Sequence, residues 1–137
     1  MLASIESYSR FVYARLDNAA SIRRHTVRLY TDSAATGVLE GRVEFEGDLA
    51  LSVFERLDFG RSRILFYSYE IYRGDELLTW YDPQPHPDDP SLASTHPHHK
   101  HVPPDIKHHR IPAPGISFSE PNLPVLISEV EALSVSQ

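Results

Sequence analysis

The first half of the chain shows two patterns of hydrophobic and polar residues, a helical one followed by a strand-like one. Between residues 4 and 17 the apolar positions recur at steps of three and four, at Ile5, Tyr8, Val12 and Leu16. This spacing predicts an amphipathic helix, and Ser4 is a suitable N-cap for it. Hydrophobic and polar residues then alternate in runs over residues 23–31, 39–46, 49–59, 62–73 and 76–81. Turn residues such as Gly47-Asp48 and Gly74-Asp75 separate the runs, so we expect an antiparallel meander of four to five strands.

The run over residues 62–73 differs from the others because it carries aromatic residues on both of its alternating sides. Tyr67 and Tyr69 fall on one side, whereas Phe66 and Tyr72 fall on the other. Since successive side chains of a strand point to opposite faces, this run predicts a central strand that is covered on both sides.

The pattern changes after Asp82, where proline becomes frequent. All eleven prolines lie between Pro83 and Pro124. Each proline removes a backbone donor and restricts the residue before it, so we expect residues 83–121 to form a long loop without regular structure. A helical pattern returns over residues 122–134. The sequence thus predicts one α+β domain over residues 1–137, consisting of a helix and meander (1–82), a proline- and histidine-rich loop (83–121) and a closing helix (122–134).

Composition and charge restrict the classes of function. The chain has no cysteine, which excludes disulfides and thiolate metal sites. Its formal charge of −6 argues against a protein that coats nucleic acid without sequence preference. Residues 96–110 nevertheless carry three basic residues against one acid, and this segment would attract an anionic ligand. Because Glu6, Arg10 and Arg15 interrupt the apolar positions near the N-terminus, we expect a cytoplasmic protein that does not associate with a membrane.

Histidine density is the main chemical signal of the chain. Seven of the eight histidines lie between His86 and His109. Imidazole titrates near neutrality, transfers protons and binds metals. Asp82 and His86 follow directly on the last predicted strand, at a position where the carboxylate could orient the imidazole.

The run His98-His99-Lys100-His101 suits phosphodiester cleavage without a metal or other cofactor. In an extended segment His99 and His101 point to one side, while Lys100 points to the other. One imidazole could take the proton of a ribose 2′-hydroxyl and the other could protonate the leaving oxygen, with Lys100 and Arg110 stabilising the charged phosphate. The tyrosines that could stack on a base or bind a phosphate are Tyr67, Tyr69 and Tyr81. The substrate would then be RNA or a nucleotide.

A metal site is the alternative chemistry for the same segment. Its ligands would be Asp82, His86, His99 and His101, a set that suits a divalent transition metal such as Zn, Ni, Mn or Fe. The sequence contains no H-E-x-x-H, G-x-G-x-x-G, P-loop or G-x-S-x-G pattern. We therefore set aside metalloprotease, dinucleotide-binding, P-loop and esterase functions.

Interpretations without catalysis remain open for these residues. The histidine segment could be a solvated strap, or it could dock a partner as a binding module. The tyrosines could simply belong to the core, and Asp82 before Pro83 is a common start of a turn. An exposed edge strand would permit a homodimer.

Three motifs follow the predicted helix in a fixed order: Tyr67-x-Tyr69, Tyr81-Asp82-x-x-Pro85-His86 and Pro97-His98-His99-Lys100-His101. This order resembles the TumE-like family of small prokaryotic proteins over most of the chain. The family is grouped with the toxins of toxin–antitoxin modules, so the resemblance implies a toxin whose partner is a cognate helix-turn-helix antitoxin. A helical part before an antiparallel meander is also similar to RelE- and barnase-like ribonucleases, an analogy of fold that favours an endoribonuclease-like activity. An inactive member retained as a structural or regulatory partner is a third interpretation.

Overall fold

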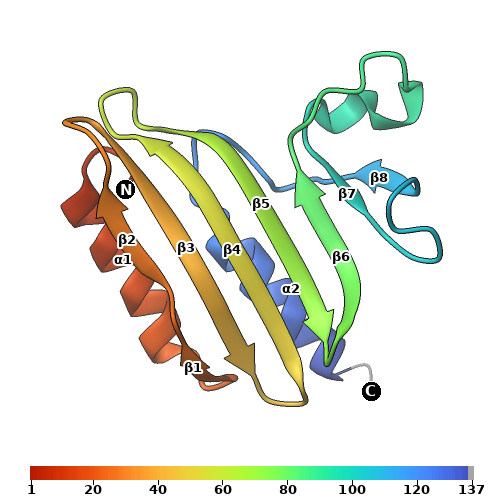
Figure 1. Cartoon of the computed structure of the whole chain (residues 1–137), viewed down its shortest axis with the longest axis horizontal. Helices are drawn as coiled ribbons and strands as arrows, with labels where there is room; N and C mark the ends of the chain where they lie inside the picture. The colour runs from red at the N-terminus through yellow and green to blue at the C-terminus, as the bar shows by residue number, and fades with distance from the viewer. Residues whose placement is uncertain (136–137) are drawn as a thin grey trace.

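An antiparallel sheet of eight strands runs through the computed structural model, which describes residues 1–135, and two helices flank it (Figure 1). The helices are α1 (Ile5–Asn18) and α2 (Leu123–Val135), with a short 3-10 helix η1 (Pro90–Thr95). The strands are β1 (Ile22–His25), β2 (Arg28–Thr31), β3 (Thr36–Phe45), β4 (Leu49–Asp58), β5 (Arg63–Arg73), β6 (Glu76–Asp82), β7 (His99–His101) and β8 (Arg110–Pro112). Their order is β1-β3-β4-β5-β6-β7-β8, with β2 also paired to β3. The predicted α+β class is confirmed.

Both helices form where the hydrophobic pattern predicts them. Ser4 caps α1 by accepting a hydrogen bond from the backbone N–H of Ser7 at 3.1 Å. The buried residues of α1 are Tyr8, Val12 and Leu16, and those of α2 are Leu123, Leu126, Ile127 and Val130. Within residues 1–135, neither helix is long and apolar enough to cross a bilayer.

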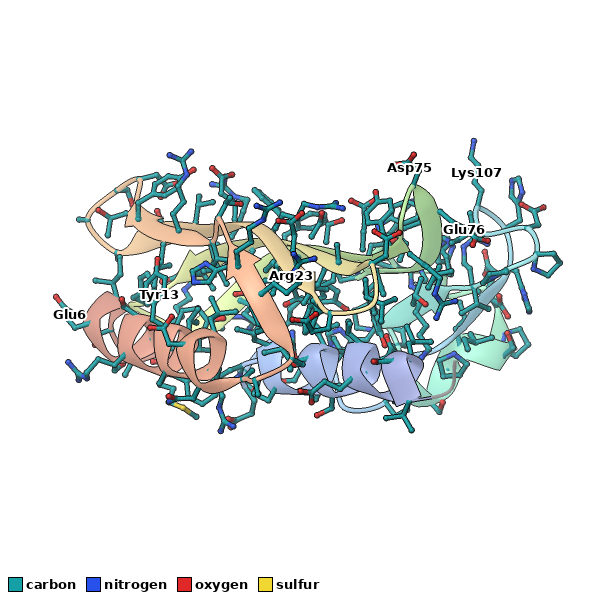
Figure 2. The ribbon with its side chains drawn as sticks, turned by 90° about the horizontal axis from the view of Figure 1, so that it is seen from below. Glu6, Tyr13, Arg23, Asp75, Glu76 and Lys107 are labelled. Carbon is teal, nitrogen blue, oxygen red and sulfur yellow. The ribbon has the colours of Figure 1, made fainter. Side chains whose placement is uncertain are left out.

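The two helices lie on the same face of the sheet (Figure 2). Tyr8 of α1 and Asn122, just before α2, both reach one buried cluster on β4 and β5, at Glu55 and Tyr69. The prediction that β5 is covered on both sides is therefore wrong. Phe66, on the opposite face of β5, is 41% exposed because no helix packs against that face.

The predicted strand over residues 23–31 is interrupted at Thr26 and Val27, which separate β1 from β2. Both strands pair with β3, His25 opposite Val43 and Arg28 opposite Glu40. Between these pairs the backbone of Val27 lies so close to Gly41 that a Cβ at position 41 would be 2.4 Å from the Cα of Val27. Gly41 also has a φ of 152°, which residues with a side chain rarely adopt. The glycine thus permits the break in the edge strand.

The prediction of a structureless loop over residues 83–121 is also wrong, and the meander has more strands than expected. This segment contains η1, β7 and β8. The run His99–His101 contains no proline, and the prolines at positions 97, 103 and 104 flank β7 instead of interrupting it. Pro112 ends β8 at the edge of the sheet, where a missing backbone N–H breaks no ladder. Pairing with β6 and β8 places β7 second from the edge of the sheet.

Candidate functional site

The pairing of β6 with β7 brings the central candidate residues together. Asp82, the last residue of β6, lies opposite His99, and Trp80 lies opposite His101. Because residues two apart on a strand share a face, these four side chains share one face of the sheet. Tyr81 and Lys100 point to the other face, where both contact Glu129 of α2.

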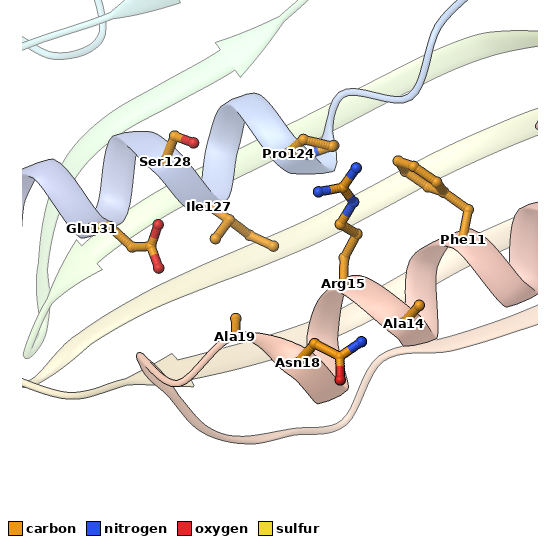
Figure 3. Close-up of a pocket in the computed structure, with 9 residues that line it drawn as sticks. All are labelled: Phe11, Ala14, Arg15, Asn18, Ala19, Pro124, Ile127, Ser128 and Glu131. Carbon is orange, nitrogen blue, oxygen red and sulfur yellow. The ribbon is translucent and has the colours of Figure 1, made fainter.

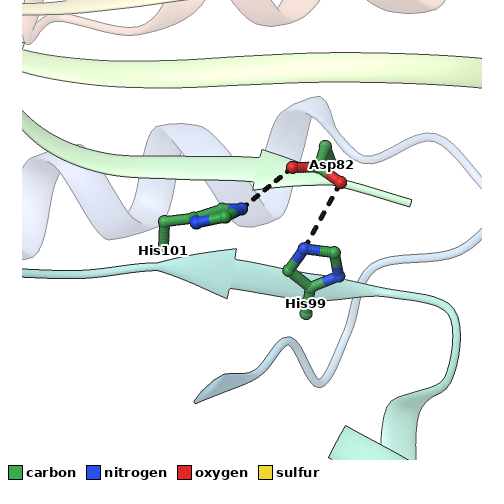
Figure 4. Close-up of side chains that lie close together, drawn as sticks. All are labelled: Asp82, His99 and His101. Atoms are coloured by element: carbon green, nitrogen blue, oxygen red, sulfur yellow. Dashed lines mark hydrogen bonds and ion pairs between the residues drawn. The ribbon is translucent and has the colours of Figure 1, made fainter. Parts of the chain in front are cut away.

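Asp82 holds both imidazoles. Nε2 of His101 lies 3.0 Å from Oδ2 of Asp82, and Nε2 of His99 lies 3.3 Å from Oδ1 (Figure 4). The two histidines are almost fully buried, at 3% and 1% exposed. The predicted common side of His99 and His101 is confirmed, but the carboxylate contacts these two rings and not the ring of His86.

Two aromatic rings cover this cluster. The Trp80 ring stacks on His101 with centroids 4.4 Å apart, and the His86 ring meets His99 edge-on at 4.9 Å. Trp80 is fixed in turn by a hydrogen bond from its indole N–H to the Ser68 hydroxyl at 3.2 Å. His86 is only half-buried, so it separates the buried cluster from solvent.

Several side chains in and beside this cluster have pKa values that differ from their usual values. Burial by itself would raise the pKa of Asp82, but His99, the backbone N–H of Gln84 and His101 outweigh burial and lower this pKa to about 2. Burial lowers the pKa of His99, yet the carboxylate of Asp82 and the carbonyl of Pro97 raise it overall. For His86, burial followed by the charges of Arg110 and His99 lowers the pKa. Asp82 is therefore a carboxylate at neutral pH, and the cluster attracts a cation.

Two adjoining cavities open beside His86. One of about 200 Å³ is lined by His86, Pro87, Asp89, Ala93 and His96. The other, of about 350 Å³, is lined by Pro85, His86, Pro87, Asp88, Asp89 and Arg110. Arg110 comes from β8, where it lies opposite His101, and its Nε is buried without a hydrogen-bond partner. The cavities thus combine two imidazoles, one guanidinium and two carboxylates.

Lys100 does not belong to this site. Its ammonium donates a 2.9 Å hydrogen bond to Oε1 of Glu129, and the hydroxyl of Tyr81 donates to the same oxygen at 2.7 Å. These contacts lie on the face of the sheet that carries the helices. The predicted phosphate-binding side chains are therefore separated, since Arg110 borders the cavity and Lys100 does not.

The three predicted substrate-binding tyrosines are part of the core. Tyr67 and Tyr69 are fully buried and stack on each other at 4.8 Å, and Tyr81 is 3% exposed. Their hydroxyls bind His98, Glu55 and Glu129 respectively. Burial raises the pKa of each of these hydroxyls above its usual value. None of these rings offers a face to a base.

The comparison with protein families identifies the chain. Residues 12–134 match the family model for Toxin TumE, which is nearly the whole length. The chain belongs to the TumE toxin family. The match includes Asp82, His99 and His101 and confirms the resemblance of the motifs. As a member of the TumE toxin family, the chain is expected to act with an antitoxin. No curated protein and no solved structure matched it.

Sequence reasoning missed two residues of the site in this TumE family member. Trp80 lies two residues before Asp82 on a predicted strand, so the period of two would have placed it on the same face. His96 is one of the seven histidines between His86 and His109, but only the turn of η1 brings it to the cavity of His86. Nothing in the local sequence predicts that return.

A larger cavity, of about 540 Å³, lies between α1 and α2, and it contains none of the predicted site residues. Side chains of both helices point into it, among them Arg15 and Glu131 (Figure 3). The candidate site residues therefore lie away from this cavity. Among residues 1–135, the group whose donor atoms lie close enough together to hold a metal ion is Asp82, His99 and His101.

Proposed function

We propose that this chain is the toxin of a toxin–antitoxin module and that it cleaves RNA at the cavities beside His86. Membership of the TumE toxin family supports the first part. One observation supports the second: His86 and His96 line one cavity, and His86 and Arg110 line the cavity next to it. Two accessible imidazoles and a guanidinium are the groups that cleavage of a phosphodiester requires.

In the proposed reaction the ribose 2′-hydroxyl attacks phosphorus and one of the two imidazoles takes its proton. The bond between phosphorus and the 5′-oxygen breaks, and the other imidazole gives a proton to that oxygen. The products are a 2′,3′-cyclic phosphate and a free 5′-hydroxyl. Arg110 donates hydrogen bonds to the non-bridging phosphate oxygens as charge develops on them.

This proposal assigns the acid–base role to His86 and His96 instead of His99 and His101, the pair suggested by the sequence. His99 and His101 are buried against Asp82, whereas His86 is half-buried, His96 is exposed, and both border the cavities. It also assigns phosphate binding to Arg110 and not to Lys100, because the ion pair with Glu129 keeps Lys100 on the opposite face of the sheet. Asp82 orients the ring of His99, and the edge-on contact of that ring with the ring of His86 then positions His86.

The test uses the purified full chain and a 5′-labelled RNA, together with induction of the gene in a bacterial host. We expect wild-type protein to produce ends with a 2′,3′-cyclic phosphate and to arrest growth. His86→Ala, His96→Ala and Arg110→Ala should each slow cleavage by about 10²-fold or more, in line with the loss of an acid–base or charge-stabilising group.

His108→Ala is the matched control, because His108 is an exposed histidine of the same segment and pairs only with Asp105. It should cleave RNA like wild type. The proposal fails if wild-type protein leaves RNA intact, or if all three cavity variants cleave RNA and arrest growth as wild type does.

The antitoxin is proposed to be a helix-turn-helix protein encoded beside this gene. Co-expression of that neighbour should relieve the growth arrest, and the two chains should co-purify. A neighbouring gene whose product neither binds the chain nor restores growth would count against this partner.

A further inference from the structure

We propose that Asp82, His99 and His101 form a binding site for one divalent transition-metal ion, buried between β6 and β7. Its three ligands are not the cavity residues that carry the proposed cleavage of RNA, although the ring of His99 contacts the ring of His86. Metal binding is measured directly, so its test does not depend on whether the chain cleaves RNA.

The spacing of the donor atoms fits such an ion. One donor atom from each residue lies within 4.8 Å of the others, and the two shortest separations are 3.0 Å and 3.3 Å, each between an imidazole Nε2 and a carboxylate oxygen. Metal bonds of about 2.1 Å to nitrogen and oxygen, at angles of about 90–110°, put neighbouring ligands about 3.0–3.4 Å apart. Two of the three donor pairs therefore already have the spacing of neighbouring ligands of one ion.

The protonation of His99 favours a cation between the rings. Its Nδ1 lies 3.2 Å from the carbonyl oxygen of Pro97, which can only accept, so Nδ1 carries the proton. In the neutral ring Nε2 then holds a lone pair that faces the Asp82 carboxylate, and this buried nitrogen has no hydrogen-bond partner. A metal-binding histidine usually donates a hydrogen bond from one ring nitrogen to a carbonyl or carboxylate and binds the metal through the other nitrogen.

His101 supplies the second nitrogen. Its Nε2 is 3.0 Å from Oδ2 of Asp82, and the stacked Trp80 ring fixes the orientation of the imidazole. Buried polar groups are almost always hydrogen-bonded, so the unpartnered Nε2 of His99, which faces the same carboxylate, indicates a missing ligand.

The donor set indicates the class of ion. Two imidazoles and one carboxylate suit Zn²⁺ and the divalent ions of iron, cobalt, nickel and manganese, whereas Mg²⁺ and Ca²⁺ prefer oxygen alone. The chain has no cysteine that could compete for a soft metal. A bound divalent ion would also neutralise the charge of the buried Asp82 carboxylate.

The experiment titrates the untagged, chelator-treated full chain with Zn²⁺ by calorimetry and with Co²⁺ by fluorescence. Trp80 is the single tryptophan of the chain and stacks on a proposed ligand, so Co²⁺ in the site should quench its emission. We expect one ion per chain. His101→Gln and Asp82→Asn should each weaken binding by more than about tenfold, because loss of a supporting outer hydrogen bond alone costs about 10–100-fold.

The matched control is His108→Gln, which breaks an exposed imidazole–carboxylate pair with nitrogen and oxygen 3.1 Å apart. It should bind like wild type, and circular dichroism should show that all variants are folded. The proposal is overturned if folded wild-type protein binds no stoichiometric ion, which leaves the proton as the only cation of the cluster. It is also overturned if His101→Gln and Asp82→Asn bind as tightly as wild type. Stoichiometric binding without RNA cleavage would refute the proposed function and leave the metal site intact.

Discussion

Lys100 and Glu129 connect β7, the strand next to the edge strand β8, to the closing helix α2. Their Nζ and Oε1 atoms lie 2.9 Å apart, and Tyr81 donates to the same carboxylate oxygen. His99 and His101, on either side of Lys100, point to the opposite face and contact Asp82. Lys100 thus has a structural role on the face that carries the helices, whereas His99 and His101 belong to the candidate site on the opposite face.

This arrangement predicts that Lys100→Gln keeps its activity. Both partners are about one-quarter exposed, so loss of the ion pair should lower the free energy of unfolding by no more than about 1 kcal/mol. Cleavage of RNA and binding of metal should match wild type. Urea unfolding and the two activity assays provide the measurement, with Glu129→Gln as the reciprocal variant. Loss of cleavage in Lys100→Gln at unchanged stability would restore Lys100 as a phosphate-binding residue.

A second prediction concerns the buried Glu55. The hydroxyls of Tyr8 and Tyr69 donate to its two carboxylate oxygens, each at 2.5 Å, yet burial raises its pKa overall. A folded-state pKa above the unfolded value of about 4.3 means that the folded chain binds this proton more tightly. The contribution of Glu55 to stability is then complete below about pH 4 and is lost as the pH rises through the folded-state pKa.

Glu55→Gln removes this titration, so its stability relative to wild type should improve as the pH rises above about 4 and through the folded-state pKa of Glu55. Urea unfolding across this range measures the difference. Glu40→Gln is the control of opposite sign, because hydrogen bonds from Arg28 and Tyr30 lower the pKa of the half-buried Glu40. Parallel pH profiles for wild type and Glu55→Gln would show that Glu55 has an ordinary pKa in the folded chain.

Gly41 provides a third prediction. A methyl group there would meet the backbone of Val27 at 2.4 Å and the carbonyl oxygen of Thr26 at 2.7 Å, on a residue with a φ of 152°. Gly41→Ala should therefore lower the free energy of unfolding by about 2–4 kcal/mol, through backbone strain and displacement of the edge strand. Gly60→Ala is the comparison, since its nearest neighbour would be the Asp58 carboxylate at 3.3 Å. Equal stability of the two variants in thermal unfolding would contradict this account.

The sequence predicted the parts of the fold that depend on local pattern. The stripe of α1 and the alternation in β3 and β4 follow from the periods of helix and strand, and so does the common side of His99 and His101. The strands β7 and β8 have three residues each and form by pairing with β6 and with each other. No window of the sequence carries that information. For the same reason the return of His96 to His86, and the position of both helices on one face, could not be predicted.

The last prediction links the metal to stability. An ion that binds only the folded chain raises the free energy of unfolding by about 2.7 kcal/mol when its free concentration is one hundred times the dissociation constant. Since Asp82 ends β6 and both histidines lie in β7, the ion would hold the sheet together at this edge. Wild-type protein should unfold at a higher temperature with Zn²⁺ than with chelator, and His108→Gln should show the same difference. His101→Gln should show a clearly smaller difference, because weaker binding gives less stabilisation at the same ion concentration. A wild-type unfolding temperature that does not respond to Zn²⁺, at a concentration that saturates any calorimetric signal, would mean that the ion does not bind between these strands.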